Sequence, residues 1–105
     1  MNKVQFTEIT EWQNITFKQA TALSKIAHLE EELLELKSDL LQDNSEKNLE
    51  FADCFILLFG AAASAGLSYE DIENAIAQKM KINYARKWGT PKSNGVVNHI
   101  SNSEG

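Results

Sequence analysis

Apolar residues recur at three- and four-residue steps through the first half of the chain. The segment from Ala20 to Leu41 is also rich in Leu, Glu, Ala and Lys, which favour helix. Its apolar positions lie on one helical face and are Ile26, Leu29, Leu33, Leu36 and Leu40. The pattern predicts a long amphipathic helix over residues 20–41.

A shorter helix is expected before it, around Thr7–Gln13, with Thr7 capping the first turn and Trp12 packing against the longer helix. After a polar link at residues 42–45, a third helix is expected from about Glu46 to Ala65. Its apolar side chains cover nearly every face and include Phe51, Phe55, Ile56, Leu57, Leu58 and Phe59. A helix that is apolar all round belongs at the centre of a fold.

Residues that favour helix ends define the bounds of the last helix. Gly66 suits the left-handed position that ends a helix, and Ser68 with Asp71 has the spacing of a capping box. We expect this helix over Tyr69–Lys87, since Gly89 and Pro91 prevent its continuation. Short links between long helices favour antiparallel neighbours. The sequence predicts an all-α antiparallel bundle over residues 1–90, followed by a polar tail over 91–105.

Composition narrows the class of protein further. A chain of 105 residues is one domain, and one proline with five glycines are too few for a β-sandwich. A domain this small with such an apolar third helix favours oligomerisation, as a homodimer or homotetramer. The single cysteine, Cys54, excludes an intramolecular disulfide and suggests a reducing compartment. With no signal peptide or membrane span in the sequence, we expect a cytoplasmic protein.

The charges are unevenly distributed along the chain. The formal net charge of -5 gives no net attraction to nucleic acid or to an anionic membrane, so neither is an expected partner. Nine of the fifteen acidic residues lie between Glu30 and Asp53, and five of the ten basic residues lie between Lys79 and Lys92. The protein therefore has an acidic segment and a basic segment.

Two carboxylate pairs stand out within the acidic segment. Glu32 and Glu35 lie about 60° apart on one helix face, at the edge of the apolar stripe, with His28 in the same sector. Glu50 and Asp53 have the same three-residue separation inside the apolar third helix. Glutamate-rich helix surfaces often merely face water, but unpaired charges near a core cost several kcal/mol each. A positive partner is therefore expected.

A divalent cation is the simplest partner for these four carboxylates. Oxygen-only ligands favour Mg²⁺ or Mn²⁺ over Zn²⁺. A di-iron bundle is the competing interpretation, but it uses Glu-x-x-His pairs, and no histidine follows a glutamate by three positions here.

The final helix changes along one face from apolar to basic. Ile72 and Ile76 begin a stripe that continues into Lys79, Asn83 and Arg86. Basic residues in a last turn also favour the helix dipole, so they can simply face water. If an acidic metal site and this stripe work together, a polyanion such as a nucleoside triphosphate joins them.

The string Glu31-Glu32-x-x-Glu35 followed by Glu50-x-x-Asp53 resembles the signature of the MazG-like all-alpha nucleoside triphosphate pyrophosphohydrolases. Other segments are similar to the MazZ-type subgroup, the phage and bacterial dATP/dGTP diphosphohydrolases. These segments are Trp12-Gln13, His28-Leu29, Asn83-x-x-Arg86-Lys87-Trp88 and Gly95-Val96-Val97-x-His99.

The resemblance implies two or more Mg²⁺ or Mn²⁺ ions and cleavage of dGTP or dATP, with GTP and ATP as ribose counterparts, to the monophosphate and pyrophosphate. It implies a catalytic set of Glu31, Glu32, Glu35, Glu50 and Asp53, of which all but Glu31 hold metal. It also implies that Lys79, Asn83 and Arg86 bind the phosphates. The further candidates for substrate binding are Lys87, Trp88, Trp12 and His28. The two tryptophans either stack on the base or pack in the core or an interface, and His28 either supports Glu32 or forms a structural hydrogen bond. The alternative is a non-catalytic helical module for dimerisation or partner binding.

Overall fold

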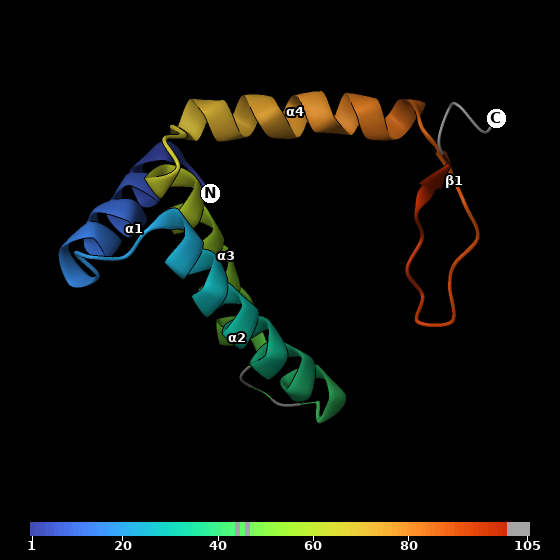
Figure 1. The fold of residues 1–105 in the computed structure, drawn as a ribbon, viewed down its shortest axis with the longest axis horizontal. Helices are drawn as coiled ribbons and strands as arrows, with labels where there is room; N and C mark the ends of the chain where they lie inside the picture. The colour runs from blue at the N-terminus through green and yellow to red at the C-terminus, as the bar shows by residue number, and fades with distance from the viewer. Residues whose placement is uncertain (44, 46, 101–105) are drawn as a thin grey trace. The chain divides into compact units, whose positions relative to one another are not determined.

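The computed structural model describes residues 1–43, 45 and 47–100. Its elements are α1 (Lys3–Thr16), α2 (Ala22–Leu41), α3 (Lys47–Ser64), α4 (Tyr69–Ala85), β1 (Lys87–Trp88) and β2 (His99–Ile100), as Figure 1 shows. The predicted all-α class is confirmed. The chain forms two compact units, Met1–Ile72 and Glu73–Gly105, and each is described by itself. The predicted division at residue 90 stays a prediction.

Helix α1 is longer than the sequence predicts, and its cap is a different residue. Asn2 has an extended backbone, and its side-chain oxygen accepts a hydrogen bond from the Gln5 N–H at 2.9 Å. The prediction that Thr7 caps this helix was wrong, because Asn is an equally good cap and lies where the helix begins. Phe6 is buried on α1, and its ring packs edge-on against Phe59 of α3.

Helix α2 begins at Ala22, two residues later than predicted. Thr21 and Ser24 cap it reciprocally, each side chain accepting a hydrogen bond from the other residue's backbone N–H. The helix ends at Leu41, as predicted. In the polar link that follows, Asn44 and the predicted helix start at Glu46 lie outside the described residues.

Helices α2 and α3 pack side by side in opposite directions (Figure 1). Their buried contact is a cluster of Leu29, Leu36, Cys54 and Leu57. At one end of the pair, the buried Lys25 of α2 donates a hydrogen bond from Nζ to Ser64 Oγ of α3 at 2.7 Å. This places a positive charge at the C-terminus of α3, where it suits the helix dipole.

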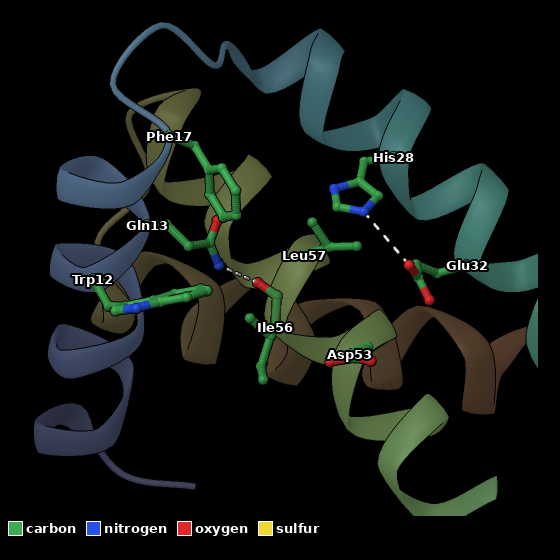
Figure 2. Close-up of a pocket in the computed structure, with 8 residues that line it drawn as sticks. All are labelled: Trp12, Gln13, Phe17, His28, Glu32, Asp53, Ile56 and Leu57. Atoms are coloured by element: carbon green, nitrogen blue, oxygen red, sulfur yellow. Dashed lines mark hydrogen bonds and ion pairs between the residues drawn. The ribbon is translucent and has the colours of Figure 1, made fainter. Parts of the chain in front are cut away.

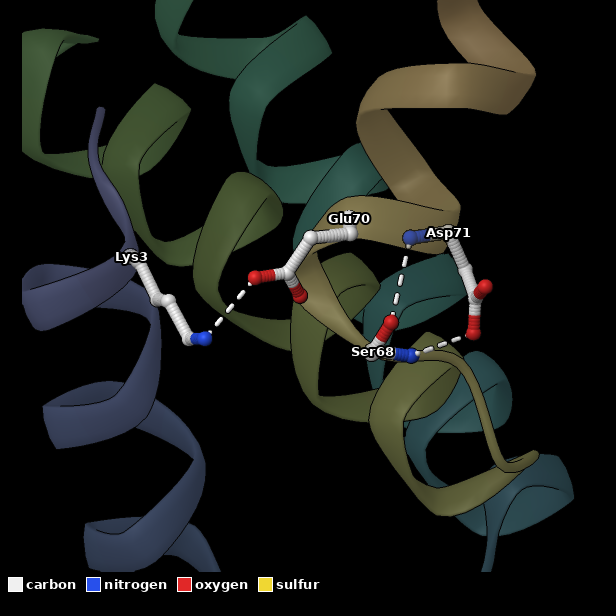
Figure 3. Close-up of polar contacts among 4 residues, drawn as sticks. All are labelled: Lys3, Ser68, Glu70 and Asp71. Carbon is white, nitrogen blue, oxygen red and sulfur yellow. Dashed lines mark hydrogen bonds and ion pairs between the residues drawn. The ribbon is translucent and has the colours of Figure 1, made fainter.

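The signals expected between α3 and α4 are confirmed. Gly66 has a φ of 100°, and its N–H and that of Leu67 donate to the carbonyls of Ala63 and Ala62, which is the Schellman arrangement. Ser68 and Asp71 then exchange two hydrogen bonds, as Figure 3 shows.

The first turn of α4 is also tied to α1. Lys3 Nζ lies 2.8 Å from Glu70 Oε1 in an exposed ion pair (Figure 3). The Tyr69 hydroxyl donates to the Met1 carbonyl, and its ring packs against Phe6. These contacts all lie within the first compact unit.

The second unit departs from the prediction at the end of α4. The helix ends at Ala85, and Lys87 lies in β1, which pairs antiparallel with β2. The prediction of helix through Lys87 was wrong, because Lys87 and Trp88 pair with residues 99–100 and do not continue the helix. Within the described residues, no single helix is long and apolar enough to span a membrane, although the bent pair α3 and α4 passes that test together.

Candidate functional site

Three predicted metal ligands converge between α2 and α3. Glu32, Glu35 and Glu50 each present a carboxylate oxygen, and these three atoms lie within 4.8 Å of one another. The three-residue spacing brings the two α2 side chains to one face, and the packing of α3 against that face adds the third. The structure therefore assembles a cluster of like charges from two helices.

The environment of this cluster disfavours its negative charge. The side chain of Glu32 is only 19% exposed, and burial, followed by the charges of Glu35 and Glu50, raises the pKa of its carboxyl. Glu50 Oε2 is buried, and no described residue forms a hydrogen bond with it. Lys47, one turn before Glu50, lies 3.1 Å from Asp43 and is engaged there.

The donor set fits a hard divalent cation. The ligand atoms are all carboxylate oxygens, which Mg²⁺ and Mn²⁺ prefer. A cation among them would be a positive partner for the Glu50 carboxylate, whose Oε2 has no hydrogen bond from the described residues. It would also offset the repulsion that adds to burial in raising the pKa of Glu32. The geometry is thus that of a candidate metal centre.

Asp53 stands beside this cluster and is not one of its three members. It is exposed on α3 and lines a pocket of about 130 Å³ together with Glu32 and His28 (Figure 2). His28 Nε2 lies 3.4 Å from Glu32 Oε1. The role of Asp53 as a metal ligand stays a prediction.

Apart from Gln13, the rest of the pocket is aromatic and apolar. Trp12 and Phe17, whose rings pack edge to face with centroids 5.5 Å apart, line it with Ile56 and Leu57 (Figure 2). The pocket therefore has carboxylates on one part of its wall and aromatic rings on another. Such a lining suits a ligand with a charged end and a flat apolar end.

Cys54 lies in the core next to Asp53. Burial raises the pKa of its thiol, and the negative charges of Glu32, Glu50 and Asp53 raise it further. A thiol held protonated in this way is a poor nucleophile, so Cys54 is a packing residue.

Sequence reasoning missed Gln13 as a residue of the site. Its side chain is fully buried in the pocket wall, where Nε2 donates to the Ile56 carbonyl at 2.7 Å. Its Oε1 is buried with no hydrogen-bond partner among the described residues. The signal available was the pair Trp12-Gln13, but a polar residue on a short helix does not reveal a contact 43 positions away.

The predicted phosphate-binding residues lie in the second unit. Lys79, Asn83 and Arg86 follow one another along α4 and just past its end, and Asn83 and Arg86 are half-buried. Lys87 and Trp88 form β1, and the Trp88 indole N–H donates to the Asn83 carbonyl. In the first unit, Glu31 is exposed on α2. The substrate-binding roles of these residues stay predictions.

Sequence comparisons place the chain among known proteins. A family profile for dATP/dGTP pyrophosphohydrolase matches residues 5–104. A dATP/dGTP diphosphohydrolase of Salmonella phage PMBT28 is 40% identical over 80 residues, which are 76% of this chain and 25% of that protein. The chain thus spans a quarter of that relative's length. A dATP/dGTP diphosphohydrolase of cyanophage S-2L is 34% identical over 97 residues, 92% of this chain and 86% of the relative.

A solved structure of a similar protein supports the same family. The chain is similar to the cyanophage S-2L MazG-like pyrophosphohydrolase, with a TM-score of 0.76 and 29% identity over 96% of this chain and 99% of that one. That protein was solved with dGDP and three catalytic Mn²⁺ ions in each active site. The resemblance deduced from the carboxylate motifs is confirmed.

Proposed function

The chain belongs to the dATP/dGTP pyrophosphohydrolase family, and from this premise we propose that it splits dGTP or dATP into the nucleoside monophosphate and pyrophosphate. The observation that carries the proposal is the cluster of Glu32, Glu35 and Glu50. One buried oxygen of Glu50 has no hydrogen-bond partner among the described residues, and a cation in the cluster would be a partner for this carboxylate. The cleavage between the α- and β-phosphates is that of pyrophosphohydrolases as a class.

Glu32, Glu35 and Glu50 would hold Mg²⁺ or Mn²⁺, with Asp53 as a fourth ligand and with more than one ion in the site. The metal supplies neutralisation of the triphosphate charge and acidification of water. Support comes from the all-oxygen donor set and from the relative of cyanophage S-2L, which binds three Mn²⁺ ions. Glu31, exposed on the same helix, would assist from outside the metal-binding set.

The surrounding side chains would orient the nucleotide. His28, 3.4 Å from Glu32, would hold that carboxylate in place, and Trp12 would offer its ring to the base at the aromatic part of the pocket. Lys79, Asn83, Arg86 and Lys87 would bind the phosphates. The cationic side chains among them would stabilise charge on the departing pyrophosphate.

Chromatography of the reaction products tests this proposal. The purified protein is incubated with Mg²⁺ and each of dGTP, dATP, dCTP, dTTP, GTP and ATP. Monophosphate and pyrophosphate are expected, with the two purine deoxynucleotides turned over fastest. Diphosphate with orthophosphate would contradict the cleavage position, and faster pyrimidine turnover would contradict the base preference. No turnover of any nucleotide would favour the non-catalytic module.

We also propose that the working species is a homodimer or homotetramer in the cytoplasm of a bacterium or of a phage-infected cell. Large apolar side chains of α3 are exposed in the single chain, among them Phe51, Phe55 and Leu58. Exposed apolar surface of this kind marks an interface more often than a solvated face. The phage origin of both relatives supports the proposed location.

A further inference from the structure

The C-terminal ribbon folds onto the end of the helix that carries the proposed phosphate-binding residues. Trp88 of β1 pairs with His99 of β2, and Lys87 pairs with Ile100. The Gly89 N–H donates to the Asn98 carbonyl at 2.8 Å and continues the pairing. A two-stranded ribbon this short is not stable alone, so its contacts with the rest of the second unit determine its role.

The ribbon holds the last turn of α4 through one side chain. Trp88 Nε1 donates to the Asn83 carbonyl at 3.1 Å. The same carbonyl accepts the longer of two hydrogen bonds from the Arg86 N–H, at 3.3 Å; the other goes to the Ile82 carbonyl at 3.1 Å. The final carbonyls of a helix have no partner further along the helix, so an indole N–H at this place acts as a C-terminal cap.

The Trp88 ring is itself supported from the other strand. Its centroid lies 6.1 Å from that of His99, with the planes at 85°, which is the favoured edge-to-face arrangement. The only polar group of the indole thus binds the Asn83 carbonyl, and its ring contacts His99. Its 47% exposure comes from the remaining surface.

We propose that Trp88 is a positioning residue: with His99 behind it, it fixes the last turn of α4 so that Asn83 and Arg86 are preorganised for a polyphosphate. This inference rests on the proposed function for the role of those two residues. Preorganisation of this kind strengthens binding because the groups are ordered before the ligand arrives. The effect is independent of the base, which distinguishes it from stacking of Trp88 on a purine.

The variant Trp88→Phe removes the N–H and keeps a ring facing His99. Tyr84→Phe is the matched control, because Tyr84 is an exposed aromatic residue on the same helix. Three quantities are measured: the exchange rate of the Arg86 amide by NMR, the Kd of inorganic tripolyphosphate with Mg²⁺ by calorimetry, and the KM for dGTP and dATP. Tripolyphosphate has no base, so it isolates the phosphate contacts.

In Trp88→Phe we expect all these quantities to rise by one common factor of about five, which corresponds to a net hydrogen-bond contribution of about 1 kcal/mol. His99→Ala should move them in the same direction by a smaller factor, and Tyr84→Phe should leave them within twofold. A higher KM for dGTP with unchanged tripolyphosphate binding would overturn the proposal in favour of base stacking. Unchanged Arg86 exchange would also overturn it.

Failure of the proposed function gives a different result. If the wild-type protein cleaves no nucleotide, the proposed function fails, while faster Arg86 exchange and weaker tripolyphosphate binding in Trp88→Phe still support the positioning role. If nucleotides are cleaved and tripolyphosphate binding does not respond to Trp88→Phe, the positioning role alone fails.

Discussion

The close approach of one neighbouring side chain requires a glycine at position 60. Gly60 lies buried in the C-terminal half of α3, where the buried Gln13 amide of α1 packs against its backbone. Gln13 can donate to the Ile56 carbonyl only because no Cβ occupies the space at Gly60. A helical glycine would otherwise weaken α3, so the close approach of α1 explains its presence.

Gly60→Ala should destabilise the protein, although alanine is the better helix former. A Cβ at Gly60 would overlap the Gln13 amide, and overpacking of this kind costs about 1 to 3 kcal/mol. Urea unfolding followed by circular dichroism measures the change. In a Gln13→Ala background the same substitution should cost much less, because the overlapping group is gone. A Gly60→Ala protein more stable than wild type would show that α1 does not pack here.

Glu50→Gln should abolish activity while leaving the helix content unchanged. The substitution removes one charge from the cluster with Glu32 and Glu35, so the metal-free protein should unfold at a higher temperature than wild type. Activity with Mg²⁺ and thermal unfolding in chelator are measured together. Glu30→Gln, an exposed change on α2, should alter neither. Wild-type turnover in Glu50→Gln, or full wild-type activity in excess chelator, would contradict the metal assignment.

At the scale of the elements, the sequence predicts what periodicity and capping residues encode. The long stripes of α2 and α3 and the local Gly66 and Ser68 signals each depend on residues a few positions apart, and the structure confirms them. The start of α1 was misplaced because Asn2 and Thr7 are both acceptable caps. The two-residue strands β1 and β2 were missed, since a strand that short has no alternation to detect.

The cap of α4 makes stability depend on pH in a predictable direction. The Ser68 backbone N–H and hydroxyl hold the pKa of Asp71 below its usual range. A carboxyl whose pKa is lowered by folding stabilises the protein above its unfolded pKa, about 3.9, and loses that contribution as pH falls through the lower folded value. Lys3 lowers the pKa of Glu70 in the same way.

The stability of wild type should therefore fall more steeply below about pH 4 than that of Asp71→Asn. Urea midpoints measured from pH 7 down to pH 2.5 give the two slopes. Glu8→Gln, which removes an exposed carboxyl from α1, controls for the loss of one acidic group. Identical slopes in wild type and Asp71→Asn would mean that the Ser68 contact does not form in solution.

At the scale of the whole molecule, the candidate site could be predicted only in part. Spacing within one helix indicated the pairs Glu32–Glu35 and Glu50–Asp53, and the packing of α2 on α3 joins three of these four residues. The pocket beside them depends on Gln13 meeting Ile56 across 43 positions, which no local pattern encodes. Periodicity shows which face of a helix is buried but not which helix covers it.

The apolar side chains that surround α3 form its apolar belt and are Phe51, Phe55, Ile56, Leu57, Leu58 and Phe59. The sequence predicts that this belt is central, and in the single chain it is only partly covered. Two apolar grooves flank Phe55, one of about 450 Å³ toward α1 and one of about 300 Å³ toward α2. Phe55 lines both grooves and is 56% exposed. An exposed phenylalanine between two such grooves favours burial against another copy of the chain.

The native species should therefore sediment at micromolar concentration with at least twice the 11.8 kDa mass of the chain. Phe55→Arg should shift it toward the single-chain mass, because a charge buried without a partner in an apolar interface costs several kcal/mol. Leu23→Arg is the matched control, since Leu23 is 82% exposed and lines neither groove. If Phe55→Arg keeps the oligomer, the interface lies elsewhere on the chain. A wild-type protein that is both monomeric and fully active would mean that one chain covers its own apolar belt, and the oligomer would then have no role in the site.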